Sequence, residues 1–361
     1  SAKTVNVNDR WQDRPSDAPF YSTAFTKGIF GRGESKGAGA CKGICITVNA
    51  PVVRPDEVLA IAGSGKALDN WNKVIPFDDS IFPVWTLSLE VTEPFMYKLL
   101  IADRQTLAPK AWEDGENRIM AVIPEKNACY VEASLEPHFS GRQWRGAGTA
   151  IPVFSLRSED DFGVGEFLDL KKMVDWAAAT GQSILQLLPI NDTTITNTWI
   201  DSYPYNSISI YAFHPMYIDL RQLGKMKDKE AAAAFEEKRL ELNALAQIDY
   251  EGVNNTKREY IRLMFQQTGK KVLASADFKQ FFKENEHWLL PYAAFSHLRD
   301  LYGTPNFSQW PEHQVYDAKA IAAMCDTKSE CYEDIAYYYY IQYNLHIQLL
   351  EAGNYARQKG I

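Results

Sequence analysis

The sequence predicts a multidomain protein in which an antiparallel β-sandwich, residues 37–136, precedes an α/β domain, residues 148–361. Between about residues 41 and 136, apolar and polar side chains alternate in short runs, turn residues separate the runs, and no helical period intervenes. A period of two is typical of half-buried strands. After residue 148 the pattern changes to helix, strand and helix, the order of an α/β domain. The length of 361 residues agrees with two domains, or with one large domain plus a module.

The sandwich strands are expected in sequence order. Residues 1–36 carry little pattern, and we interpret them as an N-terminal arm in which YSTAFTKGIF forms one strand. The glycine-rich residues 31–40 are typical of a loop. In PVWTLSLEV, apolar and polar side chains alternate, and Trp85 belongs to the apolar face. We therefore expect Trp85 to be structural. Six or seven strands are predicted, from the runs CKGICITVNAPV, EVLAIAGS, PVWTLSLEV, PFMYKLLIA, RIMAVIP and ACYVEASL.

The α/β domain follows a linker at residues 137–147. In EFLDLKKMVDWAAAT, apolar residues share one helical face and Gly181 ends the helix. SILQLLPI is nearly all apolar, which predicts a strand buried on both sides of a parallel sheet. A charged helical insertion is expected at about residues 225–300. The last segment keeps an apolar stripe that includes Tyr338 and Ile341, and Gly360 supplies a C-cap.

Charge and cysteine usage exclude several function classes. The net charge is -8, with 38 basic against 46 acidic side chains, which argues against a nucleic-acid partner. No apolar run approaches the roughly 18 residues of a membrane span, so no membrane partner is expected. The five cysteines form no C-x-x-C pair and the six histidines are scattered singly, so we predict no metal. Free thiols in a cytoplasmic protein are expected. GSGK at residues 63–66 does not fit a phosphate-binding loop.

Four motifs in the first domain carry a resemblance. The series LDNWNKVIPF, PVWTLSLEV, FMYKLLIA and KAWEDGENRIM resembles the family-20 starch-binding module over about 80 residues. This resemblance implies that Trp71 and Trp112 form a platform for the apolar faces of an α-1,4-glucan, and that Lys98 and Asn117 hydrogen-bond its hydroxyl groups. The alternative is that the tryptophans are structural and that Lys98 is a solvated surface lysine. Asp69 stands where the family has glycine. Cytosolic enzymes that carry this module before a catalytic domain have two such modules in tandem. Their resemblance implies that residues 1–36 are the tail of a preceding module.

The second domain carries another resemblance. PVFSLRSEDDFGVGEF, GQSILQLLPIND and DSYPYNSISIYAFHPMYIDL are similar to the opening of glycoside hydrolase family 77, the amylomaltases and disproportionating enzymes, over roughly residues 145–361. The resemblance implies the first part of a (β/α)8 TIM barrel. It also implies a sugar-contacting role for Tyr205, with Ser207 and Ser209 as small polar positions nearby. Tyr203 stands where many relatives have serine. The alternative for Tyr205 is burial against the next loop.

The family reaction is retaining transglycosylation by two carboxylates, without a cofactor. Asp161 and Glu166 are expected to organise a turn and a helix N-terminus, and neither they nor Asp192 is expected to be catalytic. The catalytic pair is expected beyond Ile361, in the remainder of the barrel. The implied partners are starch, maltose, maltooligosaccharides or heteroglycan. The first hypothesis is therefore a 4-α-glucanotransferase. A catalytically incomplete glucan-binding fragment is the second hypothesis, and a hydrolase of the α-amylase clan is the third.

Overall fold

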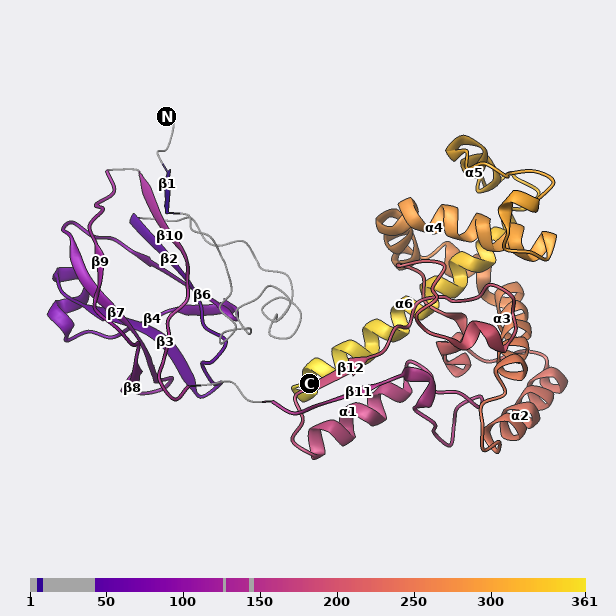
Figure 1. The fold of residues 1–361 in the computed structure, drawn as a ribbon, viewed down its shortest axis with the longest axis horizontal. Helices are drawn as coiled ribbons and strands as arrows, with labels where there is room; N and C mark the ends of the chain where they lie inside the picture. Colours follow the sequence, from indigo (N-terminus) through magenta and orange to yellow (C-terminus); the bar gives the residue numbers. More distant parts are fainter. Residues whose placement is uncertain (1–4, 9–42, 126–127, 143–145) are drawn as a thin grey trace. The chain divides into compact units, whose positions relative to one another are not determined.

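The computed structural model describes residues 5–8, 43–125, 128–142 and 146–361 of the chain. The chain divides into two compact units, residues 1–145 and 146–361 (Figure 1). Each unit has its own hydrophobic core. The expected strand YSTAFTKGIF and the glycine-rich residues 31–40 lie outside the described residues.

In its described residues, the first unit is a β-sandwich of two five-stranded sheets. In one sheet the strand order is β1 (Val5–Asn8), β10 (Cys129–Leu135), β2 (Gly43–Asn49), β6 (Val84–Leu89) and β5 (Asp78–Ile81). In the other it is β4 (Ile75–Pro76), β3 (Glu57–Gly63), β7 (Phe95–Asp103) and β8 (Pro109–Trp112), with β9 (Arg118–Met120) also paired to β7. Each of the six predicted runs overlaps one of these strands. The expectation of a purely antiparallel sandwich is wrong for β10, which runs parallel to β1 and to β2.

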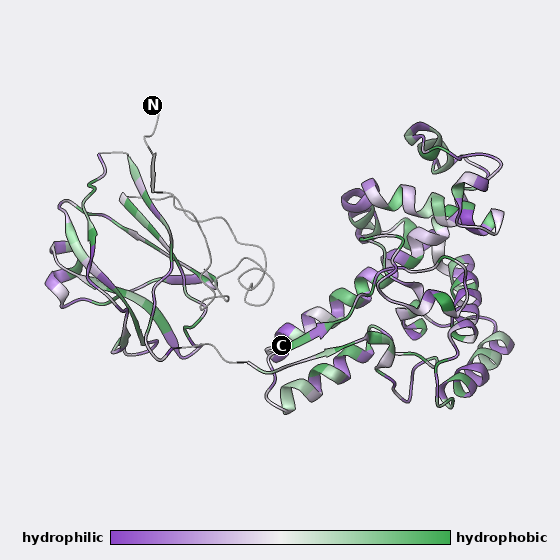
Figure 2. Ribbon diagram, in the orientation of Figure 1, coloured by the Kyte–Doolittle hydropathy of each residue, from purple (hydrophilic) through white to green (hydrophobic). Residues whose placement is uncertain are grey.

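The sandwich core confirms the alternation that the sequence shows. Hydrophobic residues, green in Figure 2, line the long strands of the unit. Trp85 is 1% exposed and its indole nitrogen donates a hydrogen bond to the carbonyl oxygen of Ala50 at 3.1 Å, so it is structural as predicted. On β7, Leu99 and Ile101 are buried as expected, but Leu100 between them is buried too. The central part of β7 is therefore covered on both faces.

The second unit begins with two parallel strands, β11 (Gly148–Ile151) and β12 (Ile184–Leu187), connected through helix α1 (Asp169–Ala179). The predicted helix and strand are thus confirmed. Leu170, Val174 and Ala177 form the buried face of α1. The prediction that the SILQLLPI strand is buried on both sides is wrong, because β12 is only half-buried. In the described part of this unit the sheet has two strands, which do not form the barrel that the family resemblance implies.

Five further α-helices follow β12 in the described part of the second unit. They are α2 (Lys229–Asn243), α3 (Tyr250–Leu273), α4 (Ala276–Tyr302), α5 (Ala318–Met324) and α6 (Tyr332–Lys359). The first three cover the segment predicted as a helical insertion. α6 contacts α1, α3 and α4, and its residues 335–342 are buried on every side. Gly360 ends α6 with a left-handed φ of 81°, as the C-cap prediction required.

Of the cysteines in the described residues, one differs from its expected state. Cys45, Cys325 and Cys331 are free thiols, whereas Cys129 is disulfide-bonded. Cysteine spacing does not determine pairing, which depends on how distant segments meet. Within the described ranges, no helix has both the length and the apolar character needed to cross a membrane. The same ranges hold no group of three or more metal-ligating side chains.

Candidate functional site

Two exposed tryptophans lie together on the first unit. Trp71 ends a short 3-10 helix, η3 (Lys66–Trp71), and Trp112 ends β8. Their side chains are 37% and 43% exposed, their ring centroids are 6.5 Å apart, and the ring planes are inclined at 54°. Large aromatic side chains left exposed in contact with one another offer an apolar surface to a ligand. The structure therefore brings together the two indoles that the sequence singled out.

The turn that presents Trp71 has an unusual backbone. Asp69, Asn70 and Trp71 have φ values of 48°, 47° and 75°, the left-handed region that side chains with a Cβ rarely enter. Asp and Asn tolerate this region better than other residues. Asn70 also locks the turn, because its side-chain oxygen accepts a hydrogen bond from Gly65 N at 3.0 Å. Strain of this kind clusters at functional sites and persists only where surrounding contacts enforce it.

The turn after Trp112 is fixed by a buried carboxylate. Glu113, 3% exposed, accepts hydrogen bonds from the backbone N–H of Leu99 at 2.7 Å and from the Arg118 guanidinium at 2.9 Å. The next residue, Asp114, accepts hydrogen bonds from His138 and Ser140, which lower its pKa. The contacts of Glu113 and Asp114 together fix the conformation of the WEDGENR turn.

Lys98 contacts this same turn, and Asn117 belongs to it. The Lys98 ammonium donates a hydrogen bond to the carbonyl oxygen of Gly115 at 2.7 Å, so part of its capacity is used by the protein. Asn117 is exposed at the end of the turn, just before β9. An ammonium has three donors, so Lys98 keeps donors for a ligand.

On the second unit, the loop after β12 presents aromatic side chains to solvent. Tyr203 and Tyr205 are 62% and 60% exposed, and their ring centroids are 5.5 Å apart. Trp199, at the start of a one-turn 3-10 helix η5 (Trp199–Ser202), is 69% exposed. The sequence reasoning missed Trp199, although an aromatic residue six positions before Tyr205 was a visible signal. The alternative that Tyr205 is buried against the next loop is wrong.

The two serines of this loop differ in their surroundings. Ser207 is exposed. The Ser209 hydroxyl oxygen accepts hydrogen bonds from the backbone N–H groups of Tyr211 and Ala212, both at 3.1 Å. Ser209 therefore shapes the turn that follows, and its hydroxyl proton remains as a donor.

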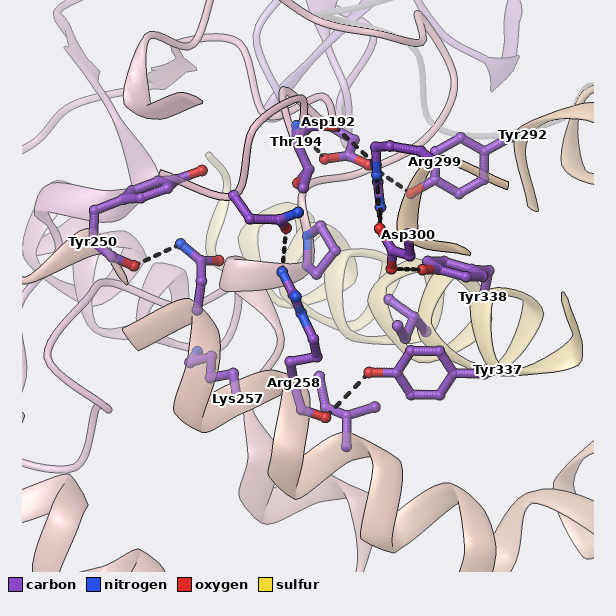
Figure 3. A pocket seen from close by; sticks show the side chains of 15 residues that line it. Asp192, Thr194, Tyr250, Lys257, Arg258, Tyr292, Arg299, Asp300, Tyr337 and Tyr338 are labelled. Carbon is purple, nitrogen blue, oxygen red and sulfur yellow. Dashed lines mark hydrogen bonds and ion pairs between the residues drawn. The ribbon is translucent and has the colours of Figure 1, made fainter. Parts of the chain in front are cut away.

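Buried polar side chains fix the two ends of the loop. At its start, Asp192 is 1% exposed and accepts hydrogen bonds from the Tyr292 hydroxyl at 2.7 Å and from Thr194 N at 2.9 Å (Figure 3). At its end, His214 Nδ1 accepts a hydrogen bond from Met216 N at 3.0 Å, and Nε2 lies 2.8 Å from the Tyr250 hydroxyl. Burial lowers the pKa of His214, so the imidazole is neutral near pH 7.

The other two carboxylates that the sequence singled out are structural. Asp161 accepts hydrogen bonds from Gly163 N at 2.8 Å and from the Asn243 side-chain amide at 2.7 Å, which organises a turn as expected. Glu166 precedes α1, but its carboxylate contacts the buried Lys257 ammonium at 2.5 Å instead of the helix N-terminus. The sequence could not indicate this pair, because the two residues are 91 positions apart. Burial raises the pKa of Glu166 to about 8, and the Lys257 charge opposes that rise.

Comparison with known proteins agrees with this division into two parts. Residues 43–131 match the starch binding domain, so the chain is a protein that carries a carbohydrate-binding module. Residues 151–361 match the 4-alpha-glucanotransferase family of glycoside hydrolase family 77. This match covers more than half of the chain, and the chain belongs to that family.

Individual relatives extend beyond this chain. The 4-alpha-glucanotransferase DPE2 of Oryza sativa subsp. japonica is 35% identical over 379 residues, which cover 99% of this chain and 39% of the rice protein. The 4-alpha-glucanotransferase of Chlamydia muridarum is 31% identical over 59% of this chain and 39% of its own length. Among solved structures, an amylomaltase from Streptococcus agalactiae in complex with acarbose is 23% identical, with a TM-score of 0.49, over 60% of this chain and 42% of that one. The chain thus spans 39% of the length of these two curated relatives.

Proposed function

We propose that this chain forms the glucan-binding module and the first barrel segment of a 4-α-glucanotransferase. The enzyme transfers α-1,4-glucosyl or glucanyl units from maltose or maltooligosaccharides to glycan acceptors such as starch or heteroglycan. The observation that carries the proposal is the exposed Trp71–Trp112 pair on a starch-binding domain, joined in one chain to a segment of the 4-alpha-glucanotransferase family.

In this proposal the module retains the glucan. The two indole faces cover the apolar faces of successive glucose rings, while Lys98 and Asn117 hydrogen-bond the sugar hydroxyl groups at the rim. The locked turn at Asn70 supports this assignment, because a preformed platform needs little ordering when the ligand binds. Tyr205, assisted by Ser207 and Ser209, contacts the glucan on the second unit.

The chemistry of the proposed enzyme is retaining transglycosylation. One carboxylate attacks the anomeric carbon, the bond to the leaving sugar breaks, and a second carboxyl group protonates that sugar. The second group then deprotonates an acceptor hydroxyl, which displaces the enzyme carboxylate. Such a pair stands roughly 5–5.5 Å apart. Asp161, Glu166 and Asp192 are engaged in structural contacts, so we propose that the catalytic pair belongs to the remainder of the barrel and that this chain alone binds without turnover.

Maltotriose distinguishes the hypotheses. A protein that contains this chain with a complete barrel is expected to convert maltotriose into glucose and longer oligomers, resolved by thin-layer chromatography. Glucose and maltose without longer products would indicate a hydrolase instead. The 361-residue chain alone is expected to leave maltotriose unchanged but to be retarded in an amylopectin gel. Disproportionation by the chain alone would show that its carboxylates include the catalytic pair.

A cytoplasmic location is part of the same proposal. It rests on the free thiols of Cys45, Cys325 and Cys331, which are typical of a reducing compartment, and the disulfide bond of Cys129 argues against it.

A further inference from the structure

We propose that Asp201 is a positioning residue for glucan binding on the second unit. Its buried carboxylate fixes the loop conformation from which Tyr203 and Tyr205 reach solvent. The inference rests on the proposed role of Tyr205 in glucan binding, and it concerns how the chain orders that side chain before the ligand arrives.

The carboxylate of Asp201 occupies a nest of backbone donors. Its Oδ2 atom accepts hydrogen bonds from three successive N–H groups, those of Ile195 at 2.9 Å, Thr196 at 2.8 Å and Asn197 at 2.7 Å. Asn197 has a left-handed φ of 60°, the backbone turn that points successive N–H groups at one acceptor. Such concave sites normally bind anions, and here the anion is the protein's own side chain.

Further contacts tie the same residue to both ends of the nest. The Thr196 hydroxyl donates a hydrogen bond to Oδ1 at 3.0 Å, and the Thr193 hydroxyl donates one to the Asp201 carbonyl oxygen. The backbone N–H of Asp201 donates a hydrogen bond to Thr198 O at 2.9 Å. Asp201 is 4% exposed, and no Lys or Arg of the described ranges forms an ion pair with it. Oriented peptide dipoles therefore stabilise its charge.

Packing does little to orient the tyrosines themselves. Both rings are about three-fifths exposed and contact each other, so their direction depends on the backbone that carries them. That backbone leaves the nest directly. Asp201 lies in η5, Tyr203 is the C-cap of η5, and Asn206 N donates a hydrogen bond to Tyr203 O at 3.3 Å. A change at Asp201 is therefore transmitted through the backbone to Tyr203, two residues later, and to Tyr205, four residues later.

The variant Asp201→Asn tests this inference. It keeps the size of the side chain but removes its charge. All binding measurements use the full chain with Trp71→Ala and Trp112→Ala, so that the module does not contribute to binding. Maltoheptaose is titrated into each variant and binding is followed by calorimetry. We expect Tyr205→Ala to weaken binding about tenfold, as for loss of one aromatic contact. We expect Asp201→Asn to weaken it by a similar factor, and the combination to weaken it no further.

The matched control is Asp161→Asn, since Asp161 is another buried carboxylate of this unit that accepts hydrogen bonds from backbone N–H groups. It should leave binding unchanged. Hydrogen exchange of residues 193–205 should accelerate in Asp201→Asn and not in the control. If Asp201→Asn does not fold, Thr196→Val removes one donor to the carboxylate and should give a smaller loss that also disappears in the Tyr205→Ala background.

Three outcomes are distinguishable. Unchanged affinity in Asp201→Asn, with Tyr205→Ala weakened, overturns the positioning role. Additive losses in the combined variant overturn it as well, because they mean that Asp201 does not act through Tyr205. Unchanged affinity in Tyr205→Ala instead removes the proposed binding role of this loop, and the positioning role with it.

Discussion

Replacing Trp71 and Trp112 by alanine should abolish retention of the chain in an amylopectin gel. The magnitude follows from the exposed surface of the rings. A large aromatic side chain has about 150–250 Å² of surface. The exposed shares of 37% and 43% leave roughly 60–100 Å² per ring for a ligand to cover.

At about 25 cal/mol per Å², each ring contributes roughly 1.5–2.5 kcal/mol of binding free energy. Each single variant should therefore weaken maltoheptaose binding by about 10- to 70-fold, and the double variant should bring it below detection. The assay is mobility in gels of increasing amylopectin content, followed by calorimetric titration.

The control is Trp176→Ala, because Trp176 is 48% exposed on α1 of the other unit and is no part of the platform. It should migrate as the parent chain does. Unchanged migration of the double variant, with an unchanged circular dichroism spectrum, would refute the platform. If Trp176→Ala lost as much retention in the gel as the double variant, exposed aromatic area would not identify the binding platform.

Three further predictions concern stability. At pH 9, above the raised pKa of Glu166, Lys257→Met leaves the buried Glu166 carboxylate without its cation and should lower the free energy of unfolding in urea by about 3–5 kcal/mol. Adding Glu166→Gln should restore part of this loss, and a loss below about 1 kcal/mol would contradict the pair. Burial lowers the pKa of His214 in the folded state, so the unfolded chain binds a proton at this residue at a higher pH than the folded chain does. The free energy of unfolding should therefore fall as the pH drops below about 6.5, and it should fall less steeply in His214→Asn. Parallel pH profiles of the two proteins would contradict this prediction. Trp85→Ala should destabilise the sandwich by about 3–5 kcal/mol in thermal unfolding, and an unchanged melting temperature would show that its indole is not part of the core.

Local sequence patterns predicted the individual helices and strands of this chain better than they predicted which elements pair with one another. The alternation around Trp85 and the helical face at Val174 follow from the period of a single element, so the sequence contains that information. Pairing across the fold has no such local signal. The parallel register of β10 against β2 joins residues more than eighty positions apart, and antiparallel hairpins were the default expectation.

The candidate sites show the same division. Trp71 and Trp112 stood out because they lie in motifs that resemble the starch-binding module, and the structure places them together. Asp201 was overlooked because most of the hydrogen bonds to its carboxylate come from backbone N–H groups, which a sequence motif does not record. Lys257 was overlooked because a lysine on a charged helix is normally solvated, and its carboxylate lies on a distant segment.

If Trp71 and Trp112 form the proposed glucan platform, the inclination of 54° between their ring planes would also determine which polymers it disfavours. Rings of a straight, ribbon-like chain share nearly one plane, so such a chain can lie flat on one indole only. Successive residues of a coiling chain turn relative to each other, and each can face its own indole. On the proposed platform a β-linked glucan would therefore make one stacking contact in place of two, and selection for the α-linkage would arise from geometry without a repulsive group.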